Sequence, residues 1–306
     1  MGAICAAPFR LRVLPTNAEE NRVVKLIMEP VQEVKRVSDL TEALRRVSGE
    51  ADRKRLWFRG HASCEWGLSP SLVREINSQD SPSLDKLALV EQYALKRFKQ
   101  LAPAVLGGRT VSDEGEWLLL MQHYRLPTRL LDWTENPLVA LYFAISSSSG
   151  TNGDKDGALW ILDPSMQNRL RLRARDDAEA LVDISDELVR SYLPQAFSSP
   201  AKPAPMKAVA VIAKRSDPRI IAQQGVFTFH AALTSLKDDV SDLCGEVGEE
   251  MDCGAVLSWV RIPRDSKGAL FNELELLGVS KASLFPELEQ VAGVVTEEMR
   301  EVLGRS

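Results

Sequence analysis

The sequence predicts an α+β fold with a central, mostly antiparallel sheet flanked by helices. Strand-like segments and segments with helical apolar spacing are interspersed along the chain, without an internal repeat. The 306 residues are 44% hydrophobic and 26% charged, so one large domain can bury a sizeable core. The net charge of -5 gives no global attraction to polyanions, and nucleic-acid binding by charge alone is not expected.

Apolar residues at helical spacing mark most of the N-terminal half. Ser38 is a good N-cap for a short amphipathic helix, and the run Leu56-Trp57-Phe58 is typical of a strand. A long helix is predicted over residues 84–101 and is stopped by Pro103. Further helices are predicted over residues 114–124 and 136–145, joined by an irregular apolar connection.

The C-terminal half alternates strands with helices. A helix is predicted over residues 178–192, and residues 271–301 are predicted to be helical with a break at Gly278. Serine and glycine make residues 146–157 a flexible surface loop, and prolines make residues 194–205 an irregular excursion. Strands are predicted over residues 158–162, 207–213, 225–230 and 255–262.

Targeting, membrane and metal signals are not found in the sequence. The N-terminus lacks a basic region followed by an apolar one, and no stretch approaches about eighteen uninterrupted apolar residues, so a cytoplasmic protein is expected. Neither the four cysteines nor the three histidines have the spacing of a zinc site. We therefore expect reduced, structural thiols and no metal.

Two polar segments are predicted to form one pocket. In the first, Trp57-Phe58-Arg59-Gly60, a guanidinium stands at the end of an apolar strand, and Gly60 allows the backbone or a ligand to approach closely. Such an arginine can hold a phosphate or a carboxylate through two hydrogen bonds. It can also simply pair with a surface carboxylate, so this segment alone leaves a structural role open.

The second segment, residues 122–143, concentrates side chains that donate, accept, stack or titrate. His123 is a candidate general base, although a lone histidine at a helix end is more often structural. Asp132 needs a partner in an apolar surround, and Arg129 is the expected one. Either Thr134 or Asn136 is a candidate cap of the following helix, a role that explains Thr134 without any catalysis.

Five motifs occur along the chain: Phe58-Arg59-Gly60, Leu68-Ser69-Pro70 to Arg74, residues 122–144, Arg219 to Phe227 with Gln224-Gly225-Val226-Phe227, and Leu284-Phe285-Pro286. Together these motifs resemble those of the FRG domain family. The resemblance covers residues 35–290, which implies an N-terminal arm at 1–34, an FRG domain, and a C-terminal helix at 291–306. It also implies a bacterial or phage-conflict context. His61 departs from the polar amide that more usually follows the glycine.

The order of motifs is more remotely similar to that of ADP-ribosyltransferases, where an arginine ends the first strand and binds NAD. This resemblance implies a split sheet and NAD as a substrate. Asp132-Trp133-Thr134 takes the place of the Ser-Thr-Ser element of those enzymes, and Gln223-Gln224-Gly225 takes the place of their catalytic glutamate. The implied catalytic residues are Arg59, His123, Asp132 and Gln224, and the implied NAD-binding residues are Arg59, Gly60, Tyr124, Arg129, Trp133, Thr134 and Gln223.

The expected function is that of an NAD-dependent ADP-ribosyltransferase, a toxin or phage-defence effector that modifies a macromolecule, either nucleic acid or protein. Cleavage of NAD requires an arginine for the diphosphate, an aromatic ring for the nicotinamide, and polar groups that steady an oxocarbenium-like ribose. Arg59, Trp133 or Tyr124, and Gln224 are the candidates for these roles. An RNA or protein acceptor is the expected partner, and an antitoxin or inhibitory protein is a further candidate.

Two other classes of function are compatible with the sequence. In a non-catalytic phosphate- or nucleotide-binding module, the missing glutamate would reflect the absence of any chemistry, and a set of basic side chains would hold the ligand. A nuclease ranks last, because no carboxylate cluster for two metal ions is found. The basic side chains of the binding module would be Arg59, Arg74, His123 and Arg129.

Overall fold

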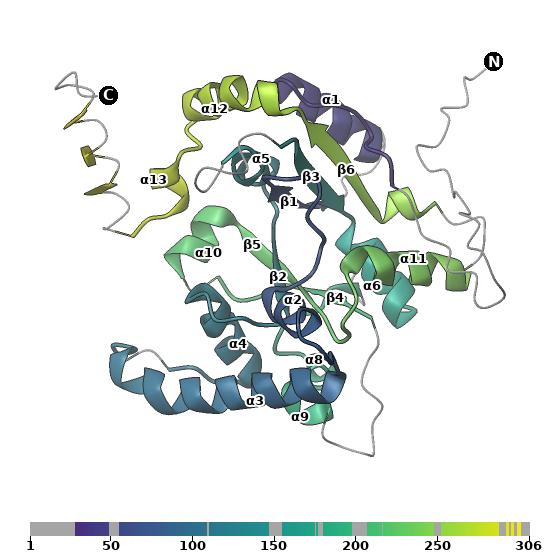
Figure 1. The fold of residues 1–306 in the computed structure, drawn as a ribbon, viewed down its shortest axis with the longest axis vertical. Coiled ribbons are helices and arrows are strands. Elements are labelled where there is room, and N and C mark those ends of the chain that lie inside the picture. Colours follow the sequence, from purple (N-terminus) through teal and green to yellow (C-terminus); the bar gives the residue numbers. More distant parts are fainter. Residues whose placement is uncertain are drawn as a thin grey trace.

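The computed structural model has an α+β fold built on a six-stranded open sheet with the strand order β4-β5-β2-β1-β3-β6 (Figure 1). Every pair of neighbouring strands is antiparallel, which confirms the predicted sheet type. The strands are β1 (Trp57–His61), β2 (Leu130–Thr134), β3 (Gly157–Leu162), β4 (Val209–Val211), β5 (Gly225–Phe229) and β6 (Leu257–Ile262). The structure describes residues 28–48, 55–108, 110–146, 155–174, 176, 180–197, 207–215, 217–247, 252–287, 292–293, 295–296 and 299–300.

The sheet opens between its two central strands. Strand β1 pairs with β3 along its whole length, and β2 pairs with β5 in the same way. By contrast, the described residues of β1 and β2 are paired at one position, Phe58 with Thr134. The sheet therefore consists of two halves, β4-β5-β2 and β1-β3-β6, that meet at one end and separate toward the other.

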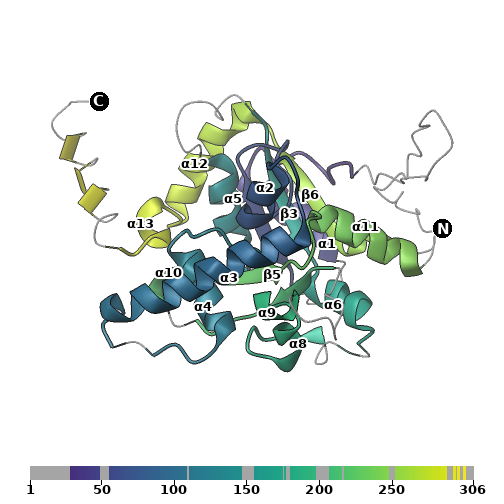
Figure 2. The same cartoon turned by 60° about the horizontal axis from the view of Figure 1, so that its bottom comes forward.

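Helices cover both faces of the sheet. Helices α1, α5 and α12 cover one face of the half β1-β3-β6, and α3 and α4 cover the same face of the half β4-β5-β2, because the paired residues Phe58 and Thr134 point to one face. Helices α6 and α11 cover the opposite face. Helix α3 runs beside α4 and α9 (Figure 2). Within the described ranges, no helix combines the length and hydrophobicity needed to cross a bilayer. The helices are α1 (Val37–Ser48), α2 (Ser71–Asn77), α3 (Leu84–Leu101), α4 (Glu114–His123), α5 (Pro137–Ile145), α6 (Pro164–Leu172), α8 (Glu187–Arg190), α9 (Pro194–Phe197), α10 (Pro218–Gln223), α11 (Leu236–Val247), α12 (Lys267–Leu276) and α13 (Lys281–Leu284).

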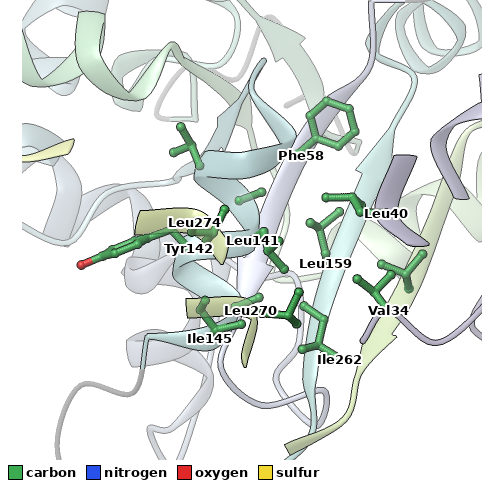
Figure 3. Packing of buried hydrophobic residues seen from close by; sticks show 14 of the residues in the cluster. Val34, Leu40, Phe58, Leu141, Tyr142, Ile145, Leu159, Ile262, Leu270 and Leu274 are labelled. Carbon is green, nitrogen blue, oxygen red and sulfur yellow. The ribbon is translucent and has the colours of Figure 1, made fainter. Parts of the chain in front are cut away.

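Helix α5 is the central packing element next to the opening. The Asn136 side chain accepts a hydrogen bond from the main chain of Leu138 at 2.9 Å, so Asn136 rather than Thr134 caps this helix. The helix is apolar on nearly all sides because the sheet lies on one side of it and α12 on the other. Figure 3 shows its residues in one cluster with side chains from β1, β3, β6 and α12.

Two glycines allow α5 to lie directly on the sheet. A Cβ atom at Gly60 would stand 1.9 Å from the carbonyl oxygen of Ala140, and one at Gly157 would stand 2.7 Å from that of Ala144. Both are closer than any real Cβ contact, so these positions require glycine. The close approach predicted at Gly60 is therefore made by the backbone of a helix.

The segment between residues 124 and 136 was predicted to be an irregular connection, but it contains strand β2. Leu130 and Leu131 are both buried, although neighbouring residues of a strand point to opposite faces. Because the sheet is covered on both faces, this part of the strand is a continuous apolar run and does not alternate between apolar and polar residues. The prediction of an irregular segment was wrong for this reason.

The helix predicted over residues 178–192 is also largely wrong. Residues 178 and 179 lie outside the described ranges, and the rest contains a regular helix over Glu187–Arg190. The main chain of Ile184 donates to Ile212 at 2.9 Å, and that of Ile212 donates to Val182 at 2.8 Å. Pairing beside β4 thus replaces the hydrogen bonds that a helix would use.

The chain ends are described in part. The predicted arm lies mostly outside the described residues, but Val31 and Val34 donate main-chain hydrogen bonds to Trp259 and Arg261 at the edge of β6. The predicted break at Gly278 is confirmed, because this glycine has a φ of 76° and separates α12 from α13. Outside the described residues lie most of the predicted 146–157 loop, the proline-rich excursion beyond residue 197, and most of the predicted C-terminal helix.

Candidate functional site

A cleft of about 490 Å³ lies where β1 and β2 separate. Its walls come from β1, from the consecutive elements α4, β2 and α5, and from α10, which belong to three separate stretches of the sequence. The two polar segments that were predicted to form one pocket therefore do meet, and the segment 223–225 forms a third wall. Of the predicted site residues, Arg59, Gly60, His123, Asp132, Trp133, Thr134 and Gln223 line the cleft.

Arg59 spans the opening between the two central strands. Its Nη1 donates to the main-chain oxygen of Asp132 at 2.5 Å, and its Nε donates to Nε2 of His61 at 2.9 Å. Burial lowers the pKa of Arg59, the Asp132 carboxylate opposes this shift, and the charge of Arg74 adds to it. The guanidinium is thus fixed in position and faces the cleft, as an anion-binding arginine requires.

Asp132 presents its carboxylate at the exposed surface of the cleft. Oδ2 accepts a hydrogen bond from the Gln122 amide at 2.7 Å, and the Thr128 hydroxyl donates to the other end of that amide at 2.7 Å. This relay fixes which end of the Gln122 amide faces the carboxylate. Gln122 also lines the cleft and was not among the predicted site residues, although it lies within the polar run that pointed to the site.

Arg129 lies outside the cleft and does not pair with Asp132 as predicted. Its side chain is completely buried, and its Nε donates to the Glu91 carboxylate at 2.7 Å. Its Nη1 donates to the main-chain oxygen of His230 at 2.9 Å, and its Nη2 donates to that of Tyr192. Two residues separated by three positions along an extended chain point to opposite faces, which places Arg129 and Asp132 apart.

Three of the predicted residues serve the framework of the cleft. The Thr134 hydroxyl donates to the main-chain oxygen of Gln223 at 2.6 Å and joins β2 to α10. The Gln223 amide donates to the main-chain oxygen of Leu284 at 3.1 Å, which joins α10 to α13. Trp133 is only 3% exposed, and its Nε1 donates to the Thr228 hydroxyl at 3.1 Å. Their side chains fix the walls of the cleft.

Two other predicted residues do not line the cleft. Tyr124 is 60% exposed, and its ring meets that of His123 edge-on at 4.8 Å between centroids. Gln224 caps α10 in the left-handed conformation with a φ of 48°, and its main-chain oxygen accepts a hydrogen bond from Glu135 at 3.1 Å. The catalytic role predicted for Gln224 would therefore require its side chain to turn toward the cleft.

Two further arginines lie along the cleft. Arg219 projects from α10, and its guanidinium stands 4.8 Å from the centre of the Phe285 ring, in a cation–π contact. Arg125 is exposed and has a φ of 61°, which is unusual for a residue with a side chain. Among the described residues, neither arginine forms an ion pair with a carboxylate. Arginines thus outnumber the acidic group Asp132 along the cleft.

The described cysteines form no disulfide, and Cys5 lies outside the described residues. In the part of the chain that the structure describes, no cluster of three or more histidine, cysteine, aspartate or glutamate side chains could hold a metal ion. The polar side chains that line the described cleft carry guanidinium, carboxylate, amide, imidazole, hydroxyl and indole groups.

These features define an α+β protein with a basic cleft at the opening of an antiparallel sheet. Residues 54–153 match the model of the FRG domain, which confirms over this segment the resemblance predicted from the motifs. The matched segment contains Arg59, His123 and Asp132, whereas the later motifs around Gln224 and Phe285 lie beyond it. No curated protein and no solved structure matches the chain.

The buried histidines predict a loss of stability in acid. Burial, aided by Arg59 for His61 and by Arg129 for His230, lowers the pKa of each from 6.5 to about 3. The unfolded chain binds protons more readily between these values, so stability is present above pH 6.5 and lost as the pH falls toward 3. For each histidine, the free energy of unfolding should fall by roughly 2 to 3 kcal/mol as the pH is lowered from 6.5 to 4.5.

Urea unfolding from pH 7 to pH 4.5 tests this prediction. The variant His61→Gln keeps an amide oxygen that can accept the bond from Arg59, and it should show a shallower pH dependence than the unaltered protein. Burial raises the pKa of Asp239 from 3.8 to about 6, so that residue acts in the opposite direction through a smaller shift. Equal slopes in the variant and in the unaltered protein would contradict the assignment to His61.

Proposed function

We propose that the cleft binds NAD and that the protein transfers ADP-ribose from it to a macromolecular acceptor. The observation that carries the proposal is the position of Arg59, held across the opening between β1 and β2 by its bond to Asp132. The proposal also rests on the remote similarity of the motif order to ADP-ribosyltransferases. A volume of about 490 Å³ lies within the usual range for small-molecule pockets.

In this proposal the ligand's two charged regions meet different walls of the cleft. Arg59 holds the diphosphate, with Arg219 of α10 as a second cation along the cleft. Asp132, oriented by the Gln122 amide, faces the positive charge that develops on the ribose as the bond to nicotinamide breaks. The geometry favours Asp132 over Gln224 for this role because Gln224 is not among the residues that line the cleft.

The aromatic contact to nicotinamide is reassigned in the proposal. Trp133 is buried and hydrogen-bonded to Thr228, and Tyr124 does not line the cleft. Trp66 does line it and is 44% exposed, so its ring is accessible to a planar ligand. We assign the stacking contact to Trp66.

Calorimetry with NAD and measurement of nicotinamide release test the proposal together. Arg59→Ala should weaken NAD binding by about 10- to 100-fold, because a charge-assisted pair of hydrogen bonds is lost. Asp132→Asn should bind NAD but release nicotinamide at least about 100-fold more slowly. The matched control is Arg97→Ala on α3, which removes an arginine that does not line the cleft.

The outcomes separate binding from folding. Arg59 also bridges two strands, so Arg59→Lys serves as a second variant, and the thermal unfolding of each variant is recorded. A lysine keeps the charge without the planar fork and should recover only part of the binding. Equal NAD affinity in Arg59→Ala and Arg97→Ala, or no binding by the unaltered protein, would reject the proposal.

A non-catalytic nucleotide-binding module is the second candidate. It is favoured by the composition of the cleft, where Asp132 is the one carboxylate and no glutamate lines the described walls. Arg129, which was assigned to this module, is buried against Glu91 and is not accessible to a ligand. Tight NAD binding without nicotinamide release, in the presence of protein and RNA acceptors, would select this alternative.

The biological setting is part of the proposal and comes from the FRG resemblance. We propose a toxin or phage-defence effector that acts in the cytoplasm on RNA or protein, with an antitoxin or inhibitory protein as a candidate partner. The exposed Arg125 at the edge of the cleft suits a phosphate-bearing acceptor. Labelling of cell extracts with radioactive NAD, before and after ribonuclease treatment, would separate the two acceptor classes.

A further inference from the structure

A histidine and an aspartate face each other at one side of the cleft. His123 is the last residue of α4, and Asp217 is the N-cap of α10. Nδ1 of His123 lies 3.5 Å from Oδ1 of Asp217, and the two side chains are 17% and 16% exposed. Asp217 did not figure among the predicted site residues, because it is far from His123 in the sequence and lies in a segment without a recognisable motif.

Both members of the pair are held in place by other contacts. Oδ1 of Asp217 accepts a hydrogen bond from the main chain of Arg219 at 2.9 Å, so the capping interaction fixes the carboxylate. The His123 ring rests edge-on against Tyr124. The other charged groups behind the pair are Glu116, which accepts hydrogen bonds from Ser112, and Lys214.

We propose that Asp217 is a positioning residue that orients His123 as the general base of the transfer reaction. The proposal rests on the function proposed above and supplies the base that the motifs left unassigned. A carboxylate beside Nδ1 favours the tautomer that carries its proton there, which leaves the lone pair on Nε2. His123 also lines the cleft, so Nε2 is the ring nitrogen available to a substrate. The separation of 3.5 Å is longer than a catalytic hydrogen bond, and such contacts often tighten when the substrate binds.

In the proposed step, a bond from C1′ of the ribose to the acceptor oxygen replaces the bond from C1′ to nicotinamide. The acceptor hydroxyl gives its proton to Nε2 of His123 while its oxygen forms a bond to C1′ of the ribose. The bond from C1′ to the nicotinamide nitrogen breaks, and its electron pair leaves with nicotinamide, which becomes neutral. Asp217 stabilises the resulting imidazolium, which then releases its proton to water.

Nitrogen NMR of the histidine rings tests the orientation without any enzymatic assay. The chain has three histidines, so variants of His61 and His230 assign the signals of His123. We expect His123 to be protonated at Nδ1 in the neutral form and to lose this preference in Asp217→Ser. Serine keeps the helix cap but is too short to reach the ring. The matched control is Asp163→Ser, which alters the cap of α6, where the Asp163 side chain accepts a hydrogen bond from Met166.

The kinetic arm tests the catalytic consequence. His123→Ala should lower kcat for ADP-ribose transfer by about 100-fold without a comparable change in KM for NAD, and added imidazole should restore part of the rate. Asp217→Ser should lower kcat by about 10-fold in the unaltered background and should have no further effect in His123→Ala. An additive effect of the two changes would overturn the positioning role.

The NMR and kinetic experiments together distinguish failure of this inference from failure of the proposed function. A neutral His123 protonated at Nε2, or a tautomer unchanged in Asp217→Ser, overturns the inference even where NAD is cleaved. If NAD is bound but not cleaved by the unaltered protein, the transferase proposal fails and the base role of His123 fails with it. The NMR result then still decides whether Asp217 orients the ring.

Discussion

Replacing Arg129 with methionine is expected to lower the free energy of unfolding by about 3 to 5 kcal/mol. The substitution leaves the Glu91 carboxylate buried without its cationic partner. It also removes the donors to the main-chain oxygens of His230 and Tyr192. Urea denaturation followed by circular dichroism measures the loss.

Two controls separate the ion pair from the volume of the side chain. The double variant Glu91→Leu with Arg129→Met removes both charges and should recover a large part of the lost stability. Arg97→Met changes an exposed arginine on the same helix as Glu91 and should stay within about 0.5 kcal/mol of the unaltered protein. A loss below about 1 kcal/mol for Arg129→Met alone would contradict the structural role.

Gly60→Ala should destabilise the protein by about 3 kcal/mol or prevent it from folding. The added methyl group would stand 1.9 Å from the carbonyl oxygen of Ala140 and 2.6 Å from the main-chain nitrogen of Ala144. Both are backbone atoms of α5, so the helix must move as a unit away from β1. Thermal unfolding measures the effect. The geometry of the cleft should also change, because residues of α5 line it.

Gly67→Ala is the matched control for this substitution. No atom lies within 4 Å of the added methyl group at Gly67, so this variant should unfold close to the unaltered protein. If Gly60→Ala were as stable as Gly67→Ala, α5 would have to lie farther from β1 than the structure places it. The comparison thus isolates the close contact from the general effect of adding alanine.

The sequence predicted the sheet type and most of the long helices because these have strong local signals. The helix over residues 84–101 matches α3, since its apolar spacing and its stop signals agree. Strand β2 was not recognised because burial on both faces removes the alternation of an exposed strand. The segment 178–192 failed because its main chain pairs with Ile212, a contact that no local pattern contains.

The cleft could be predicted as far as its residues occur in contiguous motifs. Arg59 and Asp132 lie in such motifs, and their bond across the opening brings the two segments together. The partner of a charged side chain was not predictable in the same way. Arg129 was assigned to the nearest acid in the sequence, whereas its actual partner, Glu91, lies on a separate helix. Asp217 was missed for the same reason, since its partner His123 is distant in the chain.

The opening between β1 and β2 gives two central strands the character of edge strands over part of their length. Main-chain N–H and C=O groups on the sides that face the opening can bind a guest as a sheet edge binds an added strand. A flat amide-bearing ligand could be recognised there by the backbone itself. One of these groups, the main-chain oxygen of Asp132, already accepts a hydrogen bond from Arg59, so the side chain that spans the opening also occupies part of this inner edge.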